Sequence, residues 1–193
     1  GKDYIFGSFV TGAIYLTESK DEIKQIKVPK STAFNFKNLG KTRRYGAELS
    51  AEQYFGKLTI REGYSYVKTE ILKGDLEKTD GTQVNLKGKE ITEVPNHKFA
   101  LGLDYELTSK LKFITDTVYT AGYYTSSDLE NKDGKVNSHI VTNITLNYNY
   151  SESLRVYTGI NNIFNEKYYN SINEDKFDPA AERSFNAGFK YSF

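Results

Sequence analysis

Residues 182–193, the last of the chain, alternate strictly between two kinds of side chain. One parity is aromatic or small and apolar: Phe185, Ala187, Phe189, Tyr191 and Phe193. The other is polar or small: Ser184, Asn186, Gly188, Lys190 and Ser192. Because successive side chains of a β-strand point to opposite faces of the sheet, this period of two predicts a strand with one aromatic and one polar face. Such a strand suits a transmembrane β-barrel, whose outer face contacts lipid and whose inner face contacts water.

The composition is consistent with a barrel and excludes several other classes. Aromatic residues make up 15% of the chain, as 16 Tyr and 12 Phe without any Trp, and such residues are enriched at lipid-water interfaces. No run of 18 apolar residues is present, so no membrane-spanning helix is predicted. The absence of Cys excludes disulfides, thiolate metal sites and thiol catalysis. A net charge of +1 argues against a nucleic-acid-binding protein that depends on net charge.

Eight segments of the chain alternate in this way, and the connections between them alternate in length. The predicted strands are 4–17, 42–54, 57–70, 96–107, 111–124, 138–150, 153–165 and 182–193. The short joints are 55–57, 108–110 and 151–153, and the long ones are 18–34, 71–95, 125–137 and 166–181. Transmembrane barrels have short periplasmic turns and long extracellular loops. We therefore predict an all-β, antiparallel transmembrane β-barrel region of about eight strands over residues 1–193.

Two of the predicted strands are less regular than the others. In 57–70 the apolar parity includes Glu62, which would face lipid unless it lies near an interface or a bulge at Gly63 shifts the register. In 4–17 both parities carry apolar residues, so the register of this strand is open. The polar parities carry a set of charged residues that would face the barrel interior: Arg44, Glu48, Glu52, Arg61, Asp104, Glu106, Asp116 and Arg155.

Several short segments, in their order and spacing, resemble the barrel of TonB-dependent outer-membrane receptors. They are residues 42–50, 63–66, 94–97, 101–105, 161–169 and 180–193. In that family the final strand begins with Arg-Ser/Thr-Phe, as Arg183-Ser-Phe185 does here, after a loop that contains Pro and Gly. This chain has Asp178-Pro179-Ala-Ala in place of the commoner Pro-Gly. The resemblance covers nearly the whole chain from about residue 35.

The chain is shorter than the family's usual members, which have a plug domain and a barrel of about 22 strands. It has room for about eight strands and contains neither a plug domain nor a segment that would engage TonB. Contact with TonB is therefore expected only through a plug domain, which these residues do not contain. Two alternatives follow. The chain is the C-terminal part of a larger receptor barrel, or its eight strands close into a small barrel of their own.

The resemblance implies a protein of the bacterial outer membrane that takes part in TonB-dependent uptake of a metal chelate, such as a siderophore or heme. The alternative is a stand-alone eight-stranded outer-membrane barrel with a structural or adhesin-like role. A third reading is a soluble β-sandwich with a carbohydrate-binding face, which would bury the aromatic parity between two sheets. No catalytic motif is present, so we predict that the protein is not an enzyme. We also predict that it has no cofactor and no metal site built from its own side chains.

Candidate ligand-binding residues lie where the predicted strands meet the long loops. Receptors of this family use loop aromatics together with Arg to bind anionic chelates, which implies roles for Tyr124, Tyr168, Tyr169, Lys167, Arg183 and His139. The alternative for the tyrosines is that they anchor the barrel among lipid headgroups. The alternative for His139, and for His97, is an ordinary surface position.

Three further motifs have a structural and a functional interpretation. Asn161 and Asn162, at the outer end of a strand, either cap it through backbone hydrogen bonds or contact a ligand. The segment 128–134 has the composition of a calcium loop, but its spacing does not fit one. Phe189, Tyr191 and Phe193 resemble the C-terminal signal that the barrel-assembly machinery reads, and they also suit plain contact with lipid.

Overall fold

The computed structural model describes residues 6–27, 34–78, 81–173 and 176–193. Eight long strands form the main sheet: β1 (Phe6–Ser19), β4 (Lys41–Phe55), β5 (Leu58–Lys73), β8 (His97–Glu106), β9 (Leu111–Thr120), β10 (His139–Asn149), β11 (Leu154–Asn161) and β14 (Ser184–Tyr191). Each pairs antiparallel with the strand beside it. The prediction of an all-β antiparallel fold is confirmed. Within these residues no helix is long and apolar enough to cross a membrane.

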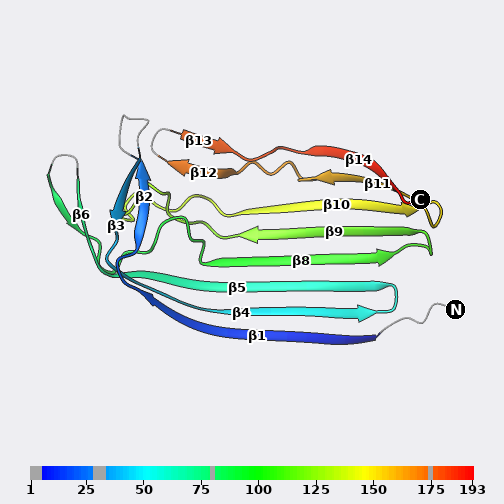
Figure 1. Ribbon diagram of the computed structural model, residues 1–193, viewed down its shortest axis with the longest axis horizontal. Helices are drawn as coiled ribbons and strands as arrows, with labels where there is room; N and C mark the ends of the chain where they lie inside the picture. The colour runs from blue at the N-terminus through cyan, green and yellow to red at the C-terminus, as the bar shows by residue number, and fades with distance from the viewer. Residues whose placement is uncertain (1–5, 28–33, 79–80, 174–175) are drawn as a thin grey trace.

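The main sheet is a meander that does not close on itself. Its strand order is β1-β4-β5-β8-β9-β10-β11-β14, so β1 and β14 are the two edges and do not pair with each other. Figure 1 shows the long strands side by side, with the short joints at one end of the sheet and all the small hairpins at the other. We call these the turn end and the loop end. A small barrel of eight self-closed strands is therefore not what the structure forms.

The strand registers put every aromatic-rich parity on one face of the sheet. We call it the apolar face and define it by Phe185 and Phe189 of β14, which are each 74% exposed. The register of β1 is now defined, because pairing with β4 places Phe6, Ser8, Val10, Gly12, Ile14 and Leu16 on this face. The sheet is a single layer, so large apolar side chains stay exposed on it. The β-sandwich interpretation, which requires this face to be buried, is wrong.

Glu62 lies on the apolar face, and no bulge removes it from there. The pairing of β5 with β4 and with β8 runs through Gly63 without a shift in register. Glu62 therefore stays in one row with Ile60 and Tyr64, and it accepts a hydrogen bond of 3.3 Å from Nε2 of Gln53. The pair places a carboxylate and an amide in a row with aromatic and aliphatic side chains.

The long loops contain three hairpins that the sequence analysis did not predict. They are β2 (Ile23–Lys27) with β3 (Phe34–Asn38), β6 (Asp75–Glu77) with β7 (Gln83–Asn85), and β12 (Tyr169–Asn173) with β13 (Lys176–Pro179). Close to these hairpins lies the apolar cluster of the described residues, in which every side chain is at most 4% exposed: Leu39, Ile71, Leu86, Ile91 and Leu129. We call this set the loop core. It joins three separate connections of the chain, so the loop end has a packed interior of its own.

Candidate functional site

His139 and Tyr168 form an aromatic stack at the loop end of the sheet. His139 is the first residue of β10, and its register with Thr120 places it on the polar face, opposite to the apolar face. The imidazole and the Tyr168 ring are nearly parallel, with centroids 4.2 Å apart and an angle of 14° between the planes. Two residues predicted from distant parts of the sequence are thus brought together.

The other four predicted site residues lie around the loop end without joining this stack. The Tyr124 ring lies under the Lys135 ammonium, 5.0 Å from its centroid. Tyr169 packs instead against Phe177 across the β12–β13 hairpin, with centroids 5.6 Å apart. Lys167 and Arg183 both have exposed side chains. They provide two cations that are open to solvent in the segments flanking the stack.

The Asn162 side chain fixes the start of the segment that carries Lys167 and Tyr168. Asn162 is only 4% exposed and has a positive φ of 50°. Its Nδ2 donates to the carbonyls of Glu166 at 2.8 Å and Ala181 at 3.3 Å, and its Oδ1 accepts from the amide of Glu166 at 2.8 Å. This is the capping role that the sequence allowed for the asparagines. Asn162 thus holds the backbone just before Lys167 and Tyr168 in place.

The second histidine lies on the other side of the sheet. His97 is paired in register with Tyr66, on the apolar face. Its Nδ1 shares a hydrogen bond of 2.8 Å with the Tyr64 hydroxyl, and its ring lies 5.1 Å from that of Tyr66. His97 is therefore part of an aromatic group on the apolar face and does not face the side that carries His139.

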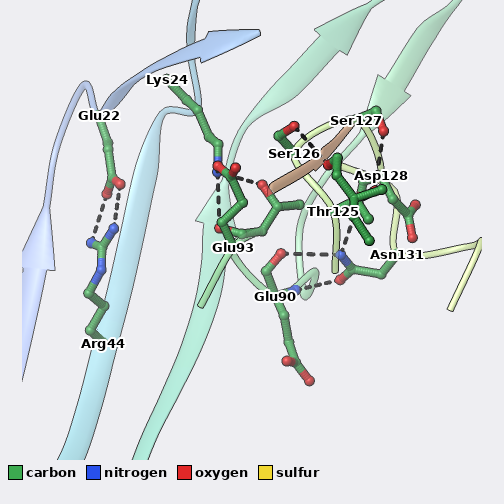
Figure 2. A network of polar contacts seen from close by, with 12 residues as sticks. Glu22, Lys24, Arg44, Glu90, Glu93, Thr125, Ser126, Ser127, Asp128 and Asn131 are labelled. Atoms are coloured by element: carbon green, nitrogen blue, oxygen red, sulfur yellow. Dashed lines mark hydrogen bonds and ion pairs between the residues drawn. The ribbon is translucent and has the colours of Figure 1, made fainter. Parts of the chain in front are cut away.

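An ion-pair network ties the β2–β3 hairpin to the sheet and to the next loop (Figure 2). Glu22, just before β2, accepts hydrogen bonds from the Arg44 guanidinium, one of them 2.9 Å long, and from the Thr42 hydroxyl. Lys24 in β2 donates to the carbonyl of Thr92 at 3.0 Å and pairs with Glu93 at 3.1 Å. The hairpin is thus fastened to strand β4 through Glu22 and to the β7–β8 connection through Lys24.

The environment of Glu22 favours its charged form. The hydrogen bond from Arg44 lowers the pKa of the Glu22 carboxyl below its ordinary value, partial burial opposes this shift, and the bond from Thr42 adds to the lowering. Arg44 is itself about one third exposed, so the pair is screened in part by solvent. The ionised carboxylate is the form that holds the hairpin.

A second polar group shapes the loop between β9 and β10 (Figure 2). The buried Asp128 carboxylate accepts the backbone amides of Lys132 at 2.8 Å and Asp133 at 3.0 Å. Asn131, at a positive φ of 53°, accepts from the amide of Glu90 at 2.6 Å and donates to its carbonyl at 3.3 Å. Asp128 is thus a loop cap, in agreement with the failed calcium spacing. Sequence reasoning missed the role of Asn131, although Asn is the residue type that best tolerates this φ.

The residues that the structure describes contain no group of three or more His, Cys, Asp or Glu side chains that would hold a metal ion. Flat rings, exposed cations and carboxamides lie on a framework held by the loop core and by the two polar networks.

Comparisons with known proteins agree with this architecture. The family described as "TonB dependent receptor-like, beta-barrel" matches residues 2–163. The ferric-pyoverdine M114 receptor PbuA of Pseudomonas sp. (strain M114) is 29% identical over 147 residues, which are 72% of this chain and 17% of that receptor. The chain thus spans about one sixth of the length of this relative.

Two solved structures share the fold. The siderophore receptor PiuA from Acinetobacter baumannii superposes with a TM-score of 0.77 at 23% identity, over 95% of this chain and 26% of PiuA. The ferric-catecholate import receptor Fiu from E. coli K12, in its closed form, gives a TM-score of 0.72 at 20% identity, over 96% of this chain and 25% of Fiu. Since the family match covers most of the sequence, the chain belongs to the TonB-dependent receptor-like β-barrel family, which is a family of receptors and not of enzymes.

Proposed function

We propose that this chain forms part of the barrel wall of a bacterial outer-membrane receptor that takes up a ferric chelate in a TonB-dependent manner. The family match and the relationship to a ferric-pyoverdine receptor support this function. In this proposal the whole region 1–193 is one arc of a larger barrel, with the apolar face toward lipid, the polar face toward the interior and the loop end outside the cell. Coupling to TonB takes place through a plug domain.

The observation that carries the ligand site is the stack of His139 on Tyr168. It lies on the polar face at the loop end, where a ligand entering the barrel from outside arrives first. A flat pair of rings suits contact with the planar groups of a chelate, and the exposed cations Lys167 and Arg183 suit its negative charge. Tyr169, next to Tyr168 in the chain, and Tyr124, at the start of the β9–β10 loop, are the further aromatic residues of the proposed site.

The C-terminal aromatics have a separate proposed role in assembly. Phe189 and Tyr191 lie on the apolar face, and the Tyr191 and Phe193 rings pack edge to face with centroids 5.5 Å apart. Phe193 is fully exposed. An exposed aromatic terminus is available to the barrel-assembly machinery before insertion and to lipid afterwards.

Binding of iron-55-labelled chelates to the intact receptor in detergent tests the ligand site. The probes are ferric pyoverdine, a ferric catecholate and ferric citrate. For the chelate that binds, we expect Tyr168→Ala and the pair Lys167→Ala/Arg183→Ala each to weaken binding about tenfold or more. The matched control is His97→Ala, which removes an imidazole from the opposite face. Equal losses for His97→Ala and Tyr168→Ala, or no loss for Tyr168→Ala, would contradict the proposed site.

A further inference from the structure

At the turn end, far from the candidate ligand site, the structure has a hollow of about 730 Å³. It lies between the joints that connect β8 to β9 and β10 to β11 and the end of β14. Its lining includes Lys110, Asn149, Glu152, Arg155, Lys190 and Ser192. We call it the turn-end hollow.

Two cations face each other across the strands at this hollow. Arg155 of β11 and Lys190 of β14 are direct partners in the register, so both side chains lie on the polar face. Like charges directly opposite each other in an antiparallel pair are destabilising. Nε of Arg155 donates to Oδ1 of Asn149 at 2.9 Å, an uncharged partner that orients the guanidinium without neutralising it.

The hollow has an excess of positive charge. Lys110 adds a third cation, and its Nζ donates to the carbonyl of Tyr150 at 3.3 Å. Glu152 is the single carboxylate of the lining, and among the residues that the structure describes it forms no ion pair with Arg155, Lys190 or Lys110. Elsewhere on the polar face Arg61 and Lys112 share a carboxylate partner, Asp104. Arg155 and Lys190 face each other without such a carboxylate between them.

We propose that the turn-end hollow is a binding site for an acidic segment of another polypeptide, with Arg155 and Lys190 as the residues that bind its carboxylates. The segment's negative charge removes the repulsion between the two cations. The hydroxyls of Ser151, Ser153 and Ser192 in the lining supply hydrogen-bonding groups for its backbone. In the orientation proposed above, the hollow opens to the periplasm, so the partner is a periplasmic protein or a periplasmic part of one.

Fluorescence anisotropy on the intact receptor in detergent tests this site. The probe is a fluorescein-labelled hexaglutamate peptide, with a hexaglutamine peptide as the uncharged comparison. We expect the acidic peptide to bind, to bind more weakly as salt is raised, and to lose at least tenfold in affinity in Arg155→Gln/Lys190→Gln. The matched control is Lys57→Gln, which removes an exposed cation from another joint at the same end of the sheet and should leave the affinity unchanged.

A second measurement separates binding from a general loss of structure. Because Arg155 and Lys190 repel each other, Lys190→Gln alone should raise the midpoint of thermal unfolding of the free receptor while it weakens peptide binding. Three results would overturn the proposal: equal binding of both peptides, an equal loss of binding in Lys57→Gln, or displacement of the acidic peptide by an equal concentration of inorganic phosphate. The last would show a site for any small anion. Because ferric-chelate binding is measured at the other end, a failure here leaves the proposed function untouched.

Discussion

At the scale of single residues, Asn162 does the most to hold the candidate site in place. Replacing it with Ala removes three hydrogen bonds made by its side chain and puts Ala at a positive φ that Asn tolerates better. We expect Asn162→Ala to lower the free energy of unfolding by about 1–3 kcal/mol, measured by denaturant unfolding of the intact receptor in detergent.

Two comparison variants separate the contributions at this position. Asn162→Gly accepts the positive φ, so it should lose less stability than Asn162→Ala if part of the cost is backbone strain. Asn161→Ala removes one exposed hydrogen bond, from Nδ2 to the Ser184 hydroxyl at 3.2 Å, and should change stability little. A loss for Asn161→Ala as large as that for Asn162→Ala would contradict the structural role given to Asn162.

Glu22 makes the attachment of the β2–β3 hairpin dependent on pH. Its pKa is lowered in the folded protein, chiefly by Arg44, so its contribution to stability is complete above the unfolded-state pKa of about 4.3 and is lost as pH falls through the lower folded value. Amide hydrogen exchange in residues 20–27 should therefore accelerate, relative to the same segment in Glu22→Gln, as pH is lowered below about 4.3. An identical pH dependence in both proteins would show that Glu22 does not hold the hairpin.

At the scale of elements, the loop core makes three loops behave as one unit. Leu129 lies in the β9–β10 loop but packs in one cluster with Ile71 of β5 and with Leu86 and Ile91 of the β7–β8 connection. Leu129→Ala should cost about 2–5 kcal/mol of local stability, because it leaves a cavity among these side chains. We expect limited proteolysis to cut faster both in the β9–β10 loop and in the β6–β7 hairpin. Faster cutting in the β9–β10 loop alone would contradict a shared core.

Glu62 is a weak point of the apolar face. A carboxylate in a row of lipid-facing side chains destabilises a membrane barrel, although less than a cation does. Since Gln53 would be left without its partner, the informative variant is the pair Gln53→Leu/Glu62→Leu. We expect it to gain up to about 2 kcal/mol of stability in lipid bilayers, measured by urea unfolding in vesicles. A loss of stability would show that Glu62 does not face lipid.

At the scale of the whole molecule, the sheet could be predicted from the sequence and the loop end could not. The alternation in β14 and β10 has a period of two and needs no partner to be recognised. The register of β1 became clear only through its pairing with β4, because both of its parities carry apolar residues. The sequence also contained the signal that the two histidines lie on opposite faces. His97 shares the parity of Phe99 on the apolar face, whereas His139 has the parity opposite to Ile140.

The loop core could not be predicted, for a physical reason. Leu39, Ile71, Leu86, Ile91 and Leu129 follow no local period, and only the folding of three connections onto one another brings them together. The hairpins of the loop end are short and largely polar, so their sequences resemble ordinary loops. The stack of His139 on Tyr168 likewise depends on the path of the chain between Asn162 and Tyr168.

The central claim is that this sheet is a membrane wall with one face in lipid and one in water. The chain has no Cys, so single Cys substitutions at 185, 186, 189 and 190 can each carry a nitroxide spin label in the intact receptor, reconstituted in bilayers. We predict that labels at 185 and 189 are relaxed more by oxygen, which dissolves in lipid, and that labels at 186 and 190 are relaxed more by a water-soluble nickel chelate. If all four labels respond alike, the claim is wrong.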